Sequence, residues 1–339
     1  MTPSLRTLAT LALGLASTAH VWAAQAGWRE ISVPAVAANA ASATVALYYP
    51  TRAPERAIPM GPFTPRVAYR AEPDAQTKGL IVLSHGTGGS ELGHTSLAEA
   101  LARSGYLVAA LRHPGDNWQD RSLPEKESAR YFSERPRQVS RLIDALLRDP
   151  DWKDRIPSDA QGPRIGAVGH SAGGYTVLAL AGGQPEPARI AAHCKTNATQ
   201  DPIFCGMGAR QNPATTGAGP DDATLRDPRI RAVVALAPVG VVFSPASLAQ
   251  VKPSVLLYDA SEDRWLVQRF HADWVARHLP GIERRTVPGA WHFAFMDKPG
   301  MPIPTDDGDV AADPPGFDRP ALLGRLALEL PAFFDRTLR

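Results

Sequence analysis

The most informative stretch of this sequence is Arg164-Ile165-Gly166-Ala167-Val168-Gly169-His170-Ser171-Ala172-Gly173-Gly174. It combines an apolar strand with the pentapeptide Gly-His-Ser-Ala-Gly, and an apolar helix is predicted to follow over 175–181. This order is typical of a nucleophile elbow, in which Ser171 occupies a strained turn with its hydroxyl exposed above a sheet edge. Glycine fits at 169 and 173 because a Cβ at either position would crowd the strand–helix crossing. The N–H of Ala172, at the helix start, is then placed to face a developing oxyanion. The alternative is a structural Gly-rich turn.

The composition argues against a nucleic-acid partner. The chain has 339 residues, with 36 lysines and arginines against 34 aspartates and glutamates. It has no basic stripe with interleaved aromatic residues, which is the usual footprint of nucleic-acid binding. A chain of this length can form a single α/β domain, and we expect one catalytic domain over 27–339.

The N-terminus is typical of a cleaved export signal. A positive charge precedes an apolar segment over 8–21, and Ala-rich cleavage positions follow over 23–26. We therefore predict a signal peptide over 1–26, a mature chain that begins near Ala24 or Gly27, and a periplasmic or secreted protein. The apolar run is short for a transmembrane helix, so no stable membrane insertion is expected after cleavage. The alternative is an anchor that is never cleaved.

Apolar runs of strand length alternate with amphipathic segments along most of the chain. This alternation predicts an α/β fold with a mainly parallel central sheet and helices on both faces. Strands are predicted at 44–49, 66–70, 80–83, 106–111, 165–168, 230–236, 254–258 and 283–287, and helices at 96–104, 136–148, 175–181, 267–278 and 321–336. His271 and His278 fall on one predicted helix, and we expect both to be ordinary surface residues.

The segment 182–228 interrupts this alternation and is rich in Gly, Pro, Asn and Asp. We interpret it as a loop-like insert near the active-site mouth. It contains Cys194 and Cys205, the two cysteines of the chain. An even count in an exported protein favours a disulfide that closes a short loop. Two free thiols, or half of a zinc site together with His193, are the alternatives.

Several motifs together resemble the α/β-hydrolase superfamily. They are Gly-His-Ser-Ala-Gly, the earlier loop Ser84-His85-Gly86-Thr87-Gly88-Gly89, and a later Asp and His. The export signal, the cysteine-bearing insert and Pro288-Gly289-Ala290-Trp291-His292 are most similar to secreted predicted dienelactone hydrolases, which resemble platelet-activating-factor acetylhydrolases and some polyester hydrolases. The resemblance covers nearly all of the mature chain and implies an α/β-hydrolase fold. Dienelactone hydrolases proper have a Cys where this chain has Ser171, so dienelactone is not the expected substrate.

The Ser–acid–His order of that superfamily implies that His292 is the general base. It follows the last predicted strand, and a loop leaving the carboxyl edge of the sheet delivers it to the nucleophile. The alternative is a structural histidine, packed beside two aromatic residues, whose hydrogen bonds are satisfied within the fold. The acid is expected a few residues beyond the strand at 254–258, which selects Asp263, with Asp259 second and Glu262 third. Its task is to hold the imidazole tautomer and stabilise the imidazolium.

An oxyanion needs two converging N–H groups, and the resemblance implies Thr87 as the partner of Ala172. A phosphate-binding Gly loop is the alternative, but no Gly-Lys-Ser/Thr follows. Four aromatic side chains are candidates for an apolar substrate pocket, with core packing as the alternative role: Trp118, Trp265, Trp291 and Phe293.

These residues predict a secreted serine hydrolase that cleaves carboxylic esters through a Ser–His–Asp triad and an acyl-enzyme. A lipase, polyester hydrolase or amidase on the same triad is the alternative, followed by a non-catalytic ligand-binding homologue. No metal or organic cofactor is implied, and the expected partner is a small-molecule or lipid-like ester. The natural substrate stays open because specificity resides in loops on a shared scaffold.

Overall fold

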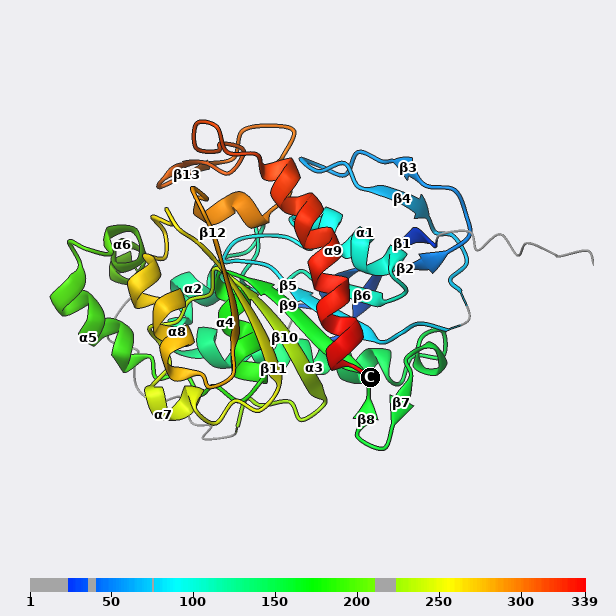
Figure 1. Ribbon diagram of the computed structural model, residues 1–339, viewed down its shortest axis with the longest axis horizontal. Helices are drawn as coiled ribbons and strands as arrows, with labels where there is room; N and C mark the ends of the chain where they lie inside the picture. Colours follow the sequence, from blue (N-terminus) through cyan, green and yellow to red (C-terminus); the bar gives the residue numbers. More distant parts are fainter. Residues whose placement is uncertain (1–23, 36–40, 75, 211–223) are drawn as a thin grey trace, which may run out of the picture.

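The computed structural model describes residues 24–35, 41–74, 76–210 and 224–339 (Figure 1). Residues 1–23 of the predicted signal peptide and residues 211–223 of the insert lie outside this part. Within the described residues, no helix combines the length and the apolar character that a membrane crossing requires.

A ten-stranded sheet forms the centre of the molecule. Its strands are β1 (Gln25–Val33), β2 (Ala43–Thr51), β3 (Arg56–Ala57), β4 (Arg66–Tyr69), β5 (Leu80–Ser84), β6 (Leu107–Leu111), β9 (Ile165–His170), β10 (Ile230–Leu236), β11 (Ser254–Ala260) and β12 (Glu283–Val287). Their order is β12–β11–β10–β9–β5–β6–β2–β1–β4–β3. The strands from β12 to β6 run parallel, whereas β2 pairs antiparallel with β6 and with β1. The predicted mainly parallel sheet is confirmed. Two small hairpins, β7 (Ser158–Asp159) with β8 (Gly162–Pro163) and β13 (Pro304–Thr305) with β14 (Gly308–Asp309), lie outside it.

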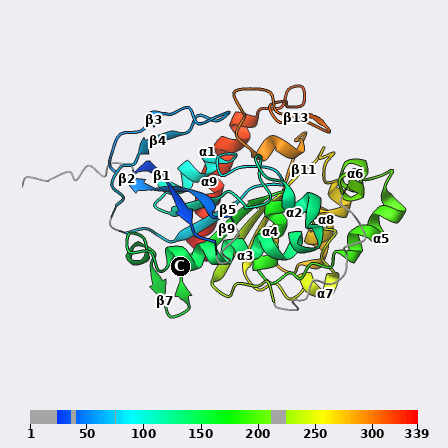
Figure 2. The same cartoon turned by 180° about the vertical axis from the view of Figure 1, so that it is seen from behind.

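Helices cover both faces of the sheet, as Figures 1 and 2 show from opposite sides. They are α1 (Thr95–Arg103), α2 (Ser122–Lys126), α3 (Ser128–Leu146), α4 (Ala172–Leu180), α5 (Ala188–Asn197), α6 (Pro202–Arg210), α7 (Pro245–Leu248), α8 (Ala272–His278) and α9 (Arg319–Thr337), with short 3-10 turns η1 (Lys153–Arg155), η3 (Gln268–Phe270) and η4 (His292–Phe295). Helices α1 and α9 pack on one face, and α3, α4 and α8 on the other. Along β5, Leu80 and Val82 face one apolar cluster, and Ile81 and Leu83 face the other. This two-sided burial explains the continuous apolar runs of the central strands.

Helix α3 begins at Ser128, not at the predicted Pro136, which lies inside it. Proline has no N–H, so the carbonyl of Phe132 lacks its usual helical donor. The hydroxyl of Tyr175 on α4 donates to that carbonyl instead. The helix therefore continues through the proline because a partner from another helix satisfies the freed acceptor.

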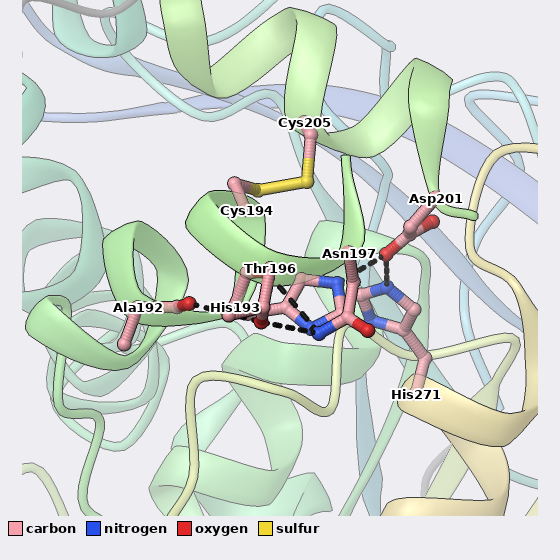
Figure 3. The surroundings of a disulfide bond; sticks show 8 residues. All are labelled: Ala192, His193, Cys194, Thr196, Asn197, Asp201, Cys205 and His271. Atoms are coloured by element: carbon pink, nitrogen blue, oxygen red, sulfur yellow. Dashed lines mark hydrogen bonds and ion pairs between the residues drawn. A yellow bond between two sulfur atoms is a disulfide. The ribbon is translucent and has the colours of Figure 1, made fainter. Parts of the chain in front are cut away.

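The predicted helix over 267–278 consists of η3 and α8, with His271 between them. His271 is completely buried, so the expectation of a surface position was wrong, while His278 is partly exposed. The Nε2 atoms of His271 and His193 bond the same oxygen of Asp201, at 3.0 and 2.9 Å (Figure 3). The periodicity did not reveal this burial because the partner belongs to the insert.

The described part of the insert is helical rather than loop-like, and α5 and α6 lie beside α8 (Figure 1). The predicted disulfide between Cys194 and Cys205 is confirmed, and it joins α5 to α6 with their Cα atoms 5.4 Å apart (Figure 3). His193 lies close to both sulfur atoms. Because the disulfide uses both sulfurs, this group offers no thiolate to a metal ion.

Strand β1 was not predicted. It begins at Gln25, and Ala26 is completely buried with its N–H donated to the Glu55 carboxylate at 2.5 Å. A mature chain that begins at Ala24 keeps the whole strand, whereas one that begins at Gly27 loses its first two residues.

Candidate active site

Ser171 lies between β9 and α4 with φ 57° and ψ −117°, a backbone conformation that residues other than glycine rarely adopt. Two bonds to the end of β10 and the residues after it hold this turn. The N–H of Ser171 donates to the carbonyl of Leu236 at 2.9 Å, and its carbonyl accepts from the N–H of Val239 at 3.2 Å. The sequence-predicted strained turn is thus present, and its side chain is only partly buried.

The two glycines of the motif are required by close backbone approach. A Cβ on Gly169 would lie 2.0 Å from the carbonyl oxygen of Gly173, and a Cβ on Gly173 would lie 1.9 Å from that of Ser84. Both separations are far below contact distance. Helix α4 can therefore leave β9 this tightly only with glycine at both positions.

His292 and Asp263 form a buried hydrogen-bonded pair beyond the ends of β12 and β11. The His292 Nδ1 lies 2.7 Å from Oδ2 of Asp263. The other carboxylate oxygen of Asp263 accepts the N–H groups of Trp265 at 2.9 Å and Leu266 at 2.8 Å. The backbone therefore orients the carboxylate, and the carboxylate orients the imidazole.

The other two candidate acids lie elsewhere. Asp259 accepts bonds from Arg284 at 2.9 Å and from Thr286 at 3.2 Å, both on the neighbouring strand β12. Glu262 is exposed. Of the three carboxylates, the structure places Asp263 against His292.

His170 connects the elbow to the segment that carries His292. Its Nε2 lies 3.0 Å from the backbone carbonyl of His292, and the two ring centroids are 4.8 Å apart. A carbonyl only accepts, so Nε2 of His170 carries the proton. Burial, reinforced by the His292 imidazole, holds the pKa of His170 well below its usual value, so the ring is neutral. The residue before Ser171 and the imidazole-bearing turn are thereby fixed to each other.

The loop after β5 passes directly over Ser171. A Cβ on Gly86 would lie 3.2 Å from the Cβ of Ser171. The N–H of Gly88 is bonded to Asp116 at 2.9 Å, and that of Gly89 to the carbonyl of Gly86 at 3.1 Å. For the N–H of Thr87, the described residues provide no such acceptor. Ala172 is the first residue of α4, so its N–H has no acceptor within the helix.

The four predicted pocket aromatics occupy different surroundings. The Trp265 ring stacks near His292, with centroids 6.0 Å apart and planes at 22°, and Phe293 packs edge-on at 5.2 Å from that imidazole. The Trp291 ring instead carries the guanidinium of Arg264 at 4.3 Å. Trp118 is 62% exposed, and its backbone N–H donates to the carbonyl of Gly89 in the loop over Ser171.

Sequence reasoning missed three polar residues beside this site. His170 was set aside because the general base was assigned by its place in the Ser–acid–His order, which selects His292. Asp116 and Arg135 form a completely buried ion pair next to the loop over Ser171. Arg135 immediately precedes Pro136, and the predicted helix started after it. Extending the predicted helix upstream of Pro136 would have placed Arg135 on its apolar side. A charged residue in that position is the signal that could have identified the ion pair.

The sheet order, the strand–turn–helix elbow and the helices on both faces define the α/β-hydrolase fold. No protein-family model and no curated protein sequence matches the chain. The chain is similar to the structure of a ferulic acid esterase from Streptomyces cinnamoneus, with a TM-score of 0.60 and 21% identity over 96% of this chain and 92% of that one. A dienelactone hydrolase from Anabaena variabilis matches with a TM-score of 0.49 and 16% identity, over 93% of this chain and 100% of that one. At this identity, the likeness to the ferulic acid esterase shows the fold.

Proposed function

We propose that this protein is a serine hydrolase that cleaves carboxylic esters. One observation carries the proposal: the strained elbow of Ser171 is joined through the preceding His170 to the backbone of His292, whose Nδ1 is bonded to a backbone-anchored carboxylate. With the Nδ1 proton bonded to Asp263, the Nε2 lone pair of His292 is available to accept the hydroxyl proton of Ser171. The ferulic acid esterase that shares the fold is an ester hydrolase by its name, which supports this substrate class.

The reaction follows from these positions. The Ser171 oxygen attacks the ester carbonyl while His292 takes its proton, and the N–H groups of Thr87 and Ala172 stabilise the oxyanion. The imidazolium then protonates the leaving alcohol, and an acyl-enzyme remains. Water, deprotonated by His292, attacks that acyl group, and collapse of the second oxyanion releases the acid and restores the serine hydroxyl. Asp263 keeps the imidazole tautomer fixed throughout.

The disulfide supports a proposed location in the periplasm or outside the cell. Disulfides persist in oxidising compartments and are rare in the cytosol. This inference agrees with the export signal expected over 1–26.

Replacing the nucleophile tests the proposal directly. Ser171→Ala is expected to abolish turnover of a chromogenic short-chain ester and labelling by a fluorophosphonate, because it removes the hydroxyl that His292 would activate. The exposed Ser158 of β7 provides the matched control, and Ser158→Ala should behave like wild type. Intact-protein mass would show one added label on wild type and on the control. A labelled or active Ser171→Ala variant, with its folded circular dichroism spectrum intact, would refute the proposal.

A further inference from the structure

Arg135 of α3 is a completely buried cation beneath the loop that passes over Ser171. Its guanidinium donates to the carboxylate of Asp116 and to the backbone carbonyl of His85. It also donates to the hydroxyl of Ser84 at 3.3 Å and to that of Thr176 at 3.2 Å. One planar group therefore connects four acceptors from β5, the following loop, the 112–121 segment and α4.

Two of these acceptors fix the backbone around Thr87, whose N–H is one of the two expected oxyanion donors. His85 lies two residues before Thr87, and its carbonyl is fixed by Arg135. The other oxygen of Asp116 accepts the N–H of Gly88 at 2.9 Å, which fixes the peptide that follows Thr87. The backbone on both sides of Thr87 is thus bonded to the same ion pair.

The same guanidinium is linked through Thr176 to Ala172, whose N–H is the second expected oxyanion donor. The hydroxyl of Thr176, which accepts from Arg135, donates to the carbonyl of Ala172 at 2.8 Å. Ala172 supplies the other expected oxyanion donor. Arg135 therefore sets the Thr87 loop and the start of α4 relative to each other through direct hydrogen bonds.

Tyr131, one turn before Arg135 on α3, adds a third link. Its hydroxyl lies 2.6 Å from the Thr87 hydroxyl, and its ring faces the Arg135 guanidinium, 5.9 Å from the centroid. This face of α3 thus presents both side chains to the loop.

We propose that Arg135, with Asp116, is a positioning residue that fixes the spacing of the Thr87 and Ala172 N–H groups for the oxyanion. This inference rests on the proposed function. Buried ion pairs are weak contributors to stability, because desolvation offsets most of their attraction, and apolar residues can often replace them without loss. Preorganised oxyanion donors, in contrast, contribute strongly to catalysis, and losing one donor costs roughly 10²–10³-fold in rate. A rigid fork of five donors suits this task, whereas lysine offers three donors at one point.

Two variants test the proposal independently. Arg135→Lys keeps the charge but cannot span all four acceptors, and Thr176→Val removes the bridge to Ala172 while preserving the side-chain shape. Arg231 provides the matched control. Its guanidinium forms a bidentate pair with Asp159 at 2.8 Å. Arg231 lies at the amino end of β10, whereas Ser171 is bonded to the carboxyl end of that strand. Arg231→Lys therefore disturbs an arginine–carboxylate pair away from Ser171.

The measurement is kcat per active site, with sites counted by fluorophosphonate end-point labelling, together with KM and the pH profile of kcat/KM. We expect kcat per labelled site to fall about tenfold or more in both test variants, with KM changed less than about twofold. The pH midpoint should stay unchanged because the His292–Asp263 pair is untouched. Arg231→Lys should keep the wild-type kcat per site.

A merely structural Arg135 would give a different result. The melting temperature or the number of labelled sites would then fall, while kcat per labelled site stayed at the wild-type value, and this outcome would overturn the proposal. A shifted pH midpoint would overturn it as well, because it would place the effect on the imidazole. If wild type neither hydrolyses esters nor takes the label, the proposed function itself fails, which is a separate result.

Discussion

Asp259 and Asp263 are four residues apart on the same strand–loop segment, and their partners give them different roles. Asp259 is nearly completely buried and bonded to Arg284 across the edge of the sheet. Asp263 accepts two backbone N–H groups and faces His292. The first carboxylate therefore joins β11 to β12, and the second orients an imidazole.

Asparagine at each position separates the two roles. Asp263→Asn should lower kcat by about 10³–10⁴-fold with little change in melting temperature, because the amide no longer fixes the reactive tautomer. Asp259→Asn should keep nearly wild-type kcat and lower the melting temperature, because Arg284 loses the buried one of its two carboxylate partners and keeps only Asp273. Steady-state kinetics and thermal denaturation check both. Full activity in Asp263→Asn would return the assignment to a neighbouring acid.

Helices α5 and α6 depend on links that lie outside their own hydrogen bonds. The Cys194–Cys205 disulfide joins two positions with a sequence separation of 11, and Asp201 bonds the preceding helix through His193 and the start of α8 through His271. Both links lie within the described part of the insert. They explain how a Gly- and Pro-rich segment holds two short helices against the domain.

Removing the disulfide should destabilise the protein without ending catalysis. For a loop of this length, the Cys194→Ser/Cys205→Ser variant should lose about 3 kcal/mol of unfolding free energy, because the unfolded chain regains closure entropy. Urea denaturation of the double variant, and of wild type with and without reductant, measures the effect. Reduced wild type should match the variant. Equal stability of all three samples would show that the remaining contacts hold α5 and α6 on their own.

Four histidines are buried around the carboxyl edge of the sheet, in the loops after β5 and β6, before α1 and at the end of β9. Burial lowers the pKa of His85 and of His94 to about 4, and holds those of His113 and His170 well below the usual value. These four imidazoles therefore stay uncharged in the folded protein at neutral pH, and they take up protons more readily when the chain unfolds.

Acidification should therefore destabilise the whole domain. Between about pH 6.5, where unfolded histidine titrates, and pH 4, the unfolded chain binds protons that the folded chain refuses, so stability falls as pH falls. Each such histidine contributes about 1.4 kcal/mol per pH unit. Asp297 acts in the opposite direction, since burial raises its pKa to about 6 and its protonation favours the folded state, but it offsets only one proton.

Urea denaturation at a series of pH values from 7 to 4.5 measures this slope. His94 has no hydrogen-bond partner for either ring nitrogen among the described residues, so His94→Phe leaves no buried group unpaired. That variant should show a slope smaller by about one proton. A stability that stays constant across this pH range would contradict the burial of neutral histidines.

Local pattern in the sequence was enough for the central strands, the elbow and the disulfide. Strands such as β5 are buried on both faces, so each is a continuous apolar run that can be recognised without its neighbours. The elbow was predictable because the apolar strand, the Gly-x-Ser-x-Gly residues and the apolar helix follow one another without a break, although the Cβ excluded at Gly173 would meet Ser84 of the neighbouring strand. The two cysteines had only each other as partners.

Features that depend on a partner elsewhere in the chain were decided only by tertiary contacts. Strand β1 is held between β2 and β4, the carbonyl freed by Pro136 is satisfied by Tyr175, and buried His271 is bonded to a carboxylate of the insert. The sequence already ranked Asp263 ahead of Asp259 by its position, but only packing brings Asp263 against His292 and Arg135 against Asp116. A buried polar side chain takes its role from the group that satisfies it, and three-dimensional packing alone brings that group within hydrogen-bond distance.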